Sequence, residues 1–389
     1  MNWKSRLQQS VTAFLTVILI TLPGWGAGTP VAAAATPACG SGDHGLLQEL
    51  QKAHNGADSV PLSFADVDFL NADTGRAAGN GFLIGTSDGG CHFQQIYTGQ
   101  WNFRQIEFPD NVHGWALATV GDGQAVYLIR TADGGSTWTR LMNKPVTFER
   151  VEFLDGSIGF GYGRASTYYT RDGGESWSLV QTPANTRGAQ FTSRNNGWAA
   201  VVVPGSGYRV MHTADGGKSW SRKLSVSAPE AGYAQLYAEG NQVYALLYGG
   251  VGMSQTSYSL YGSSNAGANW TRIIAQETAG GGPAPGSGAA KVKKGPAAGT
   301  PGNLVLTGKT AILAGYQPAA EQVGIGFTRD NGQTWKNQPT VPGFEGRISF
   351  TDPNHGWLAV KDMNGSILYS TKDAGANWTP KFTLKTEGQ

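Results

Sequence analysis

Short apolar runs alternate along most of the chain with clusters of Gly, Asp, Asn and Ser. One complete unit between residues 148 and 182 reads "FERVEFL", "IGFGYG", "STYYTR" and "SWSLVQT", with turn residues between the runs. Runs of this length, rich in aromatic and β-branched residues and bounded by turn formers, are typical of β-strands. The pattern predicts four strands that pair as one antiparallel sheet.

A turn sequence, Ser/Thr-x-Asp-x-Gly-x-x-aromatic, recurs after the third predicted strand. It reads "TADGGSTW" at 131–138, "TRDGGESW" at 170–177 and "TADGGKSW" at 213–220, with less regular copies at 86–93, 263–270, 328–335 and 371–378. The acidic or amide positions of these boxes are Asp88, Asp133, Asp172, Asp215, Asn265, Asp330 and Asp373. A repeat of about 40–45 residues fits one four-stranded propeller blade. We therefore predict an all-β fold over residues 63–389, a seven-bladed β-propeller of four-stranded antiparallel blades.

The box has a mechanical explanation. An Asp carboxylate accepts hydrogen bonds from backbone N–H groups a few residues further on, and Gly adopts the positive φ that a tight turn requires. The aromatic residue begins the fourth strand and is expected to pack between blades. A calcium loop is the functional alternative, but "DGG" lacks the alternating oxygen ligands of such a loop. The sequence predicts structural turns at the boxes and no metal site.

A second motif precedes most boxes and ends the first strand of a repeat. It reads "FPDNVHGW" at 108–115, "FLDGSIGF" at 153–160, "FTSRNNGW" at 191–198 and "FTDPNHGW" at 350–357, with a degenerate copy at 69–76. His113 and His355 occupy the same position in two copies, which favours a turn role over a catalytic one.

The two motifs together resemble a known family. The box resembles the BNR or Asp-box repeat of sialidases, sortilins and some glycosidases. Its pairing with the upstream motif is similar to the exported propellers that include the photosystem II assembly and stability factors, which many non-photosynthetic bacteria also carry. Three features depart from the pattern: Asn265 replaces Asp, the sixth repeat lacks the upstream motif, and an insert rich in Gly, Pro and Lys spans 278–302.

Composition and the N-terminus place the chain in an export pathway. Lys4 and Arg6 precede the apolar run 11–22, and small residues at 31–35 suit cleavage near Ala35, so residues 1–35 are predicted to be a signal peptide. An uncleaved anchor is the alternative. We expect a location outside the cytoplasm: extracellular, in the cell envelope, or periplasmic or lumenal. Charged residues make up only 14% of the chain and the net charge is +2, which gives no case for nucleic-acid binding.

Residues 36–62 form a leader that includes a predicted short helix in "HGLLQELQKA". Cys39 lies in this leader and Cys91 lies in the first box. Two cysteines in an exported chain favour a disulfide, which would fasten the leader to the first blade; two unpaired thiols are the alternative.

Four arginines stand three or four residues before the Phe of the upstream motif: Arg104, Arg150, Arg187 and Arg347. In a propeller this position begins the innermost strand, so the guanidinium groups would gather at one channel mouth, opposite the boxes. Arginine suits carboxylate and phosphate ligands because its donors form a planar fork. The assembly-factor resemblance also implies an arginine-rich patch. The alternative is local pairing with acids nearby: Glu107, Glu149, Glu152 and Glu345.

Catalytic motifs are scarce. The two Cys and six His show no metal-binding spacing, and there is no nucleophile elbow or phosphate-binding loop. A sialidase-like glycoside hydrolase remains an alternative, with Asp68, Glu107 and Glu152 as candidate acids by position only. The preferred hypothesis is a monomeric, non-enzymatic module without a cofactor, which binds a protein partner and assists assembly of a membrane or envelope complex.

Overall fold

The computed structural model describes residues 39, 42–54, 61–252, 255–286 and 292–385. The predicted signal peptide at 1–35 lies outside the described residues, and so do 287–291 of the 278–302 insert. No helix in the described part of the chain combines the length and the apolar run needed to cross a bilayer.

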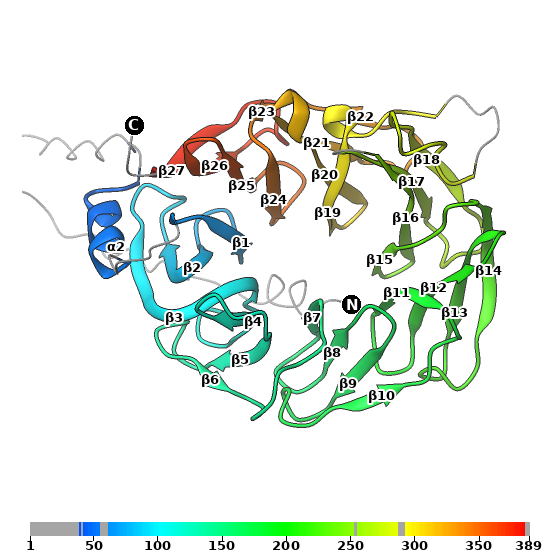
Figure 1. Cartoon of the computed structure of the whole chain (residues 1–389), viewed down its shortest axis with the longest axis horizontal. Coiled ribbons are helices and arrows are strands. Elements are labelled where there is room, and N and C mark those ends of the chain that lie inside the picture. Colours follow the sequence, from blue (N-terminus) through cyan, green and yellow to red (C-terminus); the bar gives the residue numbers. More distant parts are fainter. Residues whose placement is uncertain (1–38, 40–41, 55–60, 253–254, 287–291, 386–389) are drawn as a thin grey trace, which may run out of the picture.

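The strands form six antiparallel sheets arranged as blades around a ring (Figure 1). The first sheet contains β1 (Phe64–Phe69), β2 (Gly75–Thr86), β3 (Gln94–Glu107), β4 (Gly114–Val120), β5 (Tyr127–Thr131) and β6 (Thr139–Arg140). The second contains β7 (Arg150–Phe153), β8 (Gly159–Tyr162), β9 (Thr167–Thr170) and β10 (Ser178–Val180). The third contains β11 (Thr186–Phe191), β12 (Gly197–Val203), β13 (Gly207–Thr213) and β14 (Ser221–Ser227).

The other three sheets complete the ring. The fourth contains β15 (Ala234–Glu239), β16 (Gln242–Gly252), β17 (Gln255–Ser263) and β18 (Thr271–Gln276). The fifth contains β19 (Thr300–Thr307), β20 (Thr310–Gln317), β21 (Gln322–Thr328), β22 (Lys336–Asn337) and β23 (Val341–Pro342), with 3₁₀ turns at Pro296–Ala298 and Pro318–Ala320. The sixth contains β24 (Glu345–Phe350), β25 (Gly356–Asp362), β26 (Gly365–Thr371) and β27 (Thr379–Lys385).

The prediction of seven blades is wrong, because the first two repeats share one sheet. Strand β3 runs for 14 residues without a break. It pairs with β2 near its start and with β4 near its end, which joins the strands of two boxes into a six-stranded sheet. At the other junctions a proline, such as Pro145 or Pro183, separates the end of one repeat from the next first strand. Proline interrupts a strand because it has no N–H to donate to the neighbouring strand. Residues 94–107 contain no proline, so β3 can continue.

The ring closes between the first and sixth sheets. The sixth sheet consists of β24–β27 alone, so within the described residues no strand is exchanged across this junction. Helix α2 (Leu46–His54), in the leader, lies outside the ring beside the first sheet (Figure 1). Its buried Leu46 and Leu50 share a core cluster with Trp357 and Phe382 of the sixth sheet.

Aromatic rings stack across the junctions between sheets. The Gly-Trp or Gly-Phe end of the upstream motif lies flat against a Phe of a neighbouring sheet: Trp115 on Phe153 at 3.9 Å between ring centroids, Phe160 on Phe191 at 4.7 Å, and Trp357 on Phe69 at 4.0 Å. These aromatic residues of the repeat therefore form the packing contacts between blades.

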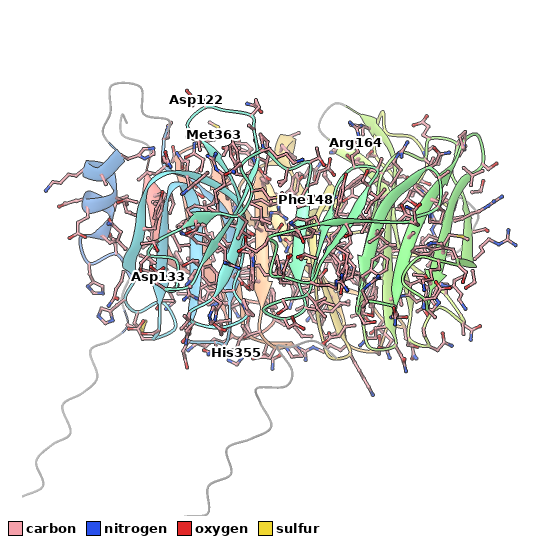
Figure 2. All side chains as sticks on the ribbon, turned by 90° about the horizontal axis from the view of Figure 1, so that it is seen from below. Asp122, Asp133, Phe148, Arg164, His355 and Met363 are labelled. Carbon is pink, nitrogen blue, oxygen red and sulfur yellow. A yellow bond between two sulfur atoms is a disulfide. The ribbon has the colours of Figure 1, made fainter. Side chains whose placement is uncertain are left out.

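Six of the seven boxes form the turn between the third and fourth strands of a repeat, whereas the first box, at 86–93, joins β2 to β3. In the box at 131–138, the Asp133 Oδ1 atom accepts hydrogen bonds from the Thr137 N–H at 2.9 Å and the Thr131 hydroxyl at 2.7 Å. Gly134 and Gly135 have φ of 74° and 103°, which a side chain would make unfavourable. Figure 2 shows Asp133 on the lower face with His355, whereas Asp122, Arg164 and Met363 lie on the upper face. The box at 131–138 thus lies on the face opposite Asp122, Arg164 and Met363.

Acid stability should depend on the box carboxylates. Hydrogen bonds to the charged carboxylates hold the pKa of Asp133 and Asp172 at about 2, with the side-chain hydroxyls of Thr137 and Ser176 contributing most. A depressed folded-state pKa adds stability that is present above about pH 4 and lost as the pH falls toward 2. Replacing both residues with Asn should flatten the dependence of the unfolding free energy on pH in that range, measured by urea denaturation.

The fifth box supplies the reason to expect that Asn preserves the turn. Asn265 Oδ1 accepts hydrogen bonds from the Asn269 N–H at 2.9 Å and the Ser263 hydroxyl at 3.0 Å, as Asp does elsewhere. Asp122→Asn, on the opposite face, is the matched control and should leave the acid response unchanged. An equally steep loss of stability in the Asp133→Asn/Asp172→Asn variant would contradict the assignment.

Candidate functional site: the central cavity

A cavity of about 910 Å³ occupies the centre of the ring. Its wall is formed mainly by the innermost strands β1, β7, β11, β15, β19 and β24, together with the end of β3. Because every sheet contributes its first strand, side chains that are far apart in sequence meet here. Acidic lining residues are Asp66, Asp68, Glu107, Glu149, Glu152, Glu239 and Asp352, and basic ones are Arg150, Arg187, Lys309 and Arg347.

The residue before the Phe of the upstream motif accepts a backbone amide of the next repeat. The Asp68 Oδ2 atom accepts the Phe108 N–H at 2.6 Å, and the Glu107 Oε1 atom accepts the Phe153 N–H at 3.1 Å. The Ser349 hydroxyl accepts the Phe69 N–H at 3.1 Å across the closing junction. Two of the candidate glycosidase acids, Asp68 and Glu107, therefore hold backbone amides: Asp68 within the first sheet and Glu107 across the junction to the second sheet.

Arg150 pairs with a nearby acid, Glu152, which is the local pairing given above as the alternative to a ligand-binding patch. Its Nη1 atom lies 3.0 Å from Glu152 Oε2, its Nη2 atom donates to the Ala189 carbonyl at 3.0 Å, and its guanidinium lies 4.0 Å from the Tyr162 ring centroid. Glu152 also accepts a hydrogen bond from Gln190 at 2.7 Å. This network fixes one guanidinium in the cavity wall and engages the third candidate acid.

Arg187 and Arg347 also line the cavity, in different surroundings. Arg187 donates from Nη1 to the Thr186 carbonyl at 3.1 Å, a bond that uses one of the five N–H donors of a guanidinium. Arg347 interacts electrostatically with Asp66, whose pKa is raised to about 6 because burial outweighs the opposing effect of Arg347. The Asp66 Oδ2 atom also accepts the Ile106 N–H at 3.0 Å.

Arg104 is not among the lining residues and is exposed. The pairing of β3 with β4 shifts register between Phe103 and Gln105, so Arg104 is the extra residue of a bulge. A bulged residue leaves the strand's alternation and redirects its side chain. The pairing of β11 with β12 shifts register in the same way between Thr186 and Gly188, yet Arg187 lines the cavity, so the bulge does not separate the two residues. The structure brings together three of the four predicted arginines.

A group of tyrosines from β15, β16 and the turn before them was not anticipated from sequence. The Tyr233 and Tyr248 rings lie 5.2 Å apart, and the hydroxyl groups of Tyr237 and Tyr248 donate to Gln235 Oε1 at 2.7 and 3.3 Å. Tyr233, Gln235 and Tyr237 line the cavity, and burial raises the pKa of Tyr237 to about 12. The available signal was the alternation in "GYAQLYAEG" at 232–240, which places Tyr233, Gln235 and Tyr237 on one face of the strand.

The two His residues of the upstream motif form turn contacts. His113 Nδ1 lies 3.0 Å from Asp110, and His355 Nδ1 lies 2.7 Å from Asp352. Both aspartates also accept backbone N–H groups of the same turn. Within the described residues, no group of three or more His, Cys, Asp or Glu side chains is placed to hold a metal ion.

Cys39 and Cys91 form the disulfide expected from the sequence. Their Cα atoms lie 4.8 Å apart, and the bond links the leader to the first box. This pair lies on the closing junction of the ring, away from the cavity wall.

The fold, the boxes and the cavity together define a β-propeller of the BNR, or Asp-box, type. More particularly, the chain resembles the photosystem II assembly factors: the family described as "Photosynthesis system II assembly factor YCF48" matches residues 142–300. No curated protein matches the chain in sequence.

Solved structures share the fold at low identity. YCF48 bound to a D1 peptide is 19% identical with a TM-score of 0.50, covering 80% of this chain and 94% of that one. YCF48 from Cyanidioschyzon merolae is 14% identical with a TM-score of 0.49, covering 83% and 96%. A GH74 xyloglucanase from Xanthomonas campestris is 12% identical with a TM-score of 0.56, covering 83% of this chain and 54% of the enzyme.

Proposed function

We propose that this propeller is a non-enzymatic protein-binding module that assists assembly of a membrane or envelope complex after export. The observation that carries the proposal is the cavity in which Arg150, Arg187 and Arg347 lie among tyrosines and amides. Tyr and Arg are the residues that most often dominate protein–protein binding energy. The resemblance to YCF48, which was solved with a D1 peptide, supports a peptide segment as the ligand.

The charges of the wall favour a peptide over a polyanion. Acidic side chains outnumber basic ones around the cavity, so the wall does not form a uniformly positive surface. Asp68 and Glu107 accept backbone amides, whereas Arg187 uses a single donor in its bond to Thr186. A peptide with a carboxylate at one point and polar or aromatic groups elsewhere fits this distribution.

Export is part of the proposal. The Cys39–Cys91 disulfide supports an oxidising compartment, in agreement with the signal peptide expected at 1–35. We further propose that the mature protein acts as a monomer, with the rigid ring presenting the cavity to its partner.

The arginines provide the test. Replacing Arg150, Arg187 and Arg347 with Ala should weaken binding of the D1 peptide, the first probe, by at least about tenfold, because guanidinium contacts to a carboxylate are charge-assisted. The salt dependence of binding should also become flatter. Titration calorimetry at two ionic strengths measures both effects.

Arg104→Ala is the matched control, since that residue is exposed on the bulge outside the cavity wall. Thermal unfolding of each variant separates lost binding from lost folding, which matters for Arg150 because its removal leaves Glu152 without this partner. Co-purification of the tagged mature protein from its native membrane fraction identifies the physiological partner. Unchanged affinity and salt response would remove the cavity arginines from the site, and turnover of sialosides or glucans would favour a glycoside hydrolase instead.

A further inference from the structure

The leader contacts both sides of the closing junction around one disulfide. The Gly42 N–H donates to the Lys381 carbonyl of β27 at 2.7 Å, and the Gly42 carbonyl accepts the Phe93 N–H, next to β3, at 3.1 Å. Cys39 is bonded to Cys91 in the first box. The segment therefore clasps the first sheet to the sixth, and we call residues 39 and 42–54, with their disulfide, the leader clasp.

The two sulfur atoms of the leader clasp have different electrostatic surroundings. The Lys381 Nζ atom lies 3.3 Å from the Cys39 Sγ atom. On the Cys91 side, the backbone N–H of Cys91 donates to Asp88 Oδ1 at 3.0 Å. A thiolate on Cys39 would be stabilised by the adjacent ammonium, whereas the ionisable side chain that contacts the main chain of Cys91 is a carboxylate.

Other charged and titratable groups surround this pair. His92 Nδ1 lies 2.6 Å from Asp88 Oδ2. His44 stacks on His92 at 4.4 Å and bonds the Cys91 carbonyl through Nε2 at 3.0 Å. Burial and Lys372 lower the Lys381 pKa, whereas Asp88 acts in the opposite direction, so this carboxylate is within electrostatic range of the ammonium as well. An anion on Cys39 would further favour the charged ammonium.

We propose that Cys39–Cys91 is a thiol–disulfide exchange site for a dithiol oxidoreductase, with Cys91 as the sulfur that is attacked and Cys39 as the leaving thiolate. Cys39 is exposed and Cys91 is partly exposed, with the exposed imidazoles of His44 and His92 beside it. Exchange is faster when the leaving thiol is more acidic, which is the property that Lys381 confers on Cys39.

The exchange requires two steps and transfers two electrons. A thiolate of the reductant attacks Cys91 Sγ, the Cys39–Cys91 bond breaks, and Cys39 leaves as a thiolate beside the Lys381 ammonium. The second thiolate of the reductant then attacks the reductant sulfur that is bonded to Cys91. This step releases the Cys91 thiolate, which takes up a proton. The reductant becomes a disulfide and the protein holds two reduced cysteines.

Reduction would loosen the leader clasp without removing it. The Gly42 hydrogen bonds and the buried Leu46 and Leu50 remain, but the covalent link to the first box is lost. Amide hydrogen exchange in α2 and at Phe93 is expected to accelerate on reduction, while β12 and β13 on the far part of the ring remain unchanged.

Single-cysteine variants test the difference between the two sulfur atoms. In Cys91→Ser the pH midpoint for iodoacetamide labelling of Cys39 should lie about one unit below the midpoint for Cys91 in Cys39→Ser. Adding Lys381→Met should raise the Cys39 midpoint, whereas Lys52→Met, on the exposed side of α2, should not. Equal midpoints, or no response to Lys381→Met, would overturn the charge assignment.

The site of attack is tested on the intact disulfide. A thioredoxin-type protein that lacks its resolving cysteine traps the mixed disulfide, and peptide mapping shows which sulfur carries it. We expect the adduct on Cys91 and about threefold slower reduction by dithiothreitol in Lys381→Met. An adduct mainly on Cys39, or a disulfide that the folded protein does not exchange, would overturn the proposal. Neither outcome depends on ligand binding at the cavity.

Discussion

Trp357→Ala should lower the free energy of unfolding by about 3–5 kcal/mol, the range for removing a large buried aromatic side chain. Only 2% of Trp357 is exposed, and its ring stacks on Phe69 at 4.0 Å between centroids. These two residues belong to the sixth and first sheets, so the cavity left by the substitution would lie in the closing junction of the ring. Urea denaturation measures the loss.

Two further variants distinguish an effect specific to the closing junction from a general loss of packing. Trp357→Phe keeps an aromatic ring against Phe69 and should retain part of the lost stability. Leu179→Ala, at a side chain that is 55% exposed, should change stability by no more than about 0.5 kcal/mol. Hydrogen exchange in Trp357→Ala should accelerate first in β1 and β27, and uniform acceleration around the ring would contradict the importance of this stack.

The local architecture was predictable because each repeat encodes its own turn. The Asp133 carboxylate accepts a hydrogen bond from the backbone N–H of Thr137, four residues further on, so the interaction depends only on nearby sequence. The upstream Phe and Trp could likewise be expected at blade junctions, since large aromatic residues at a fixed position in a β repeat need a common place to be buried. Local rules of this kind predicted the strands, the boxes and the propeller class.

The number of sheets depended on a weaker signal. Seven boxes suggested seven blades, but whether two repeats form separate sheets depends on the strand between them. Residues 94–107 lack the proline found at the other junctions, and β3 therefore continues through both pairings. The missing proline was visible in the sequence, and the continuous pairing of β3 outweighs the box count here.

The cavity shows a second limit of sequence reasoning. The repeat correctly indicated which strands are innermost, but not that Arg104 would be exposed while Arg187, at a similar register shift, lines the cavity. Likewise, proximity in sequence could not decide which acids pair with arginines: Glu152 bonds Arg150, whereas Glu107 accepts the Phe153 amide of the next sheet. Contacts across blades depend on the closed ring, which the spacing of one repeat does not specify.

Replacing both Cys39 and Cys91 with Ser should lower the free energy of unfolding by about 4 kcal/mol in the chain-entropy description of disulfides. The bond closes a loop with a sequence separation of 52 residues, and the unfolded chain without it gains the corresponding freedom. Urea denaturation of the oxidised protein, the reduced protein and the double Ser variant measures the effect, and the last two should agree. Equal stability of all three would show that α2 and the Gly42 hydrogen bonds hold the leader without covalent help. A loss confined to faster hydrogen exchange in α2, with global unfolding unchanged, would show that the leader opens as a separate unit and that the disulfide does not secure the ring itself.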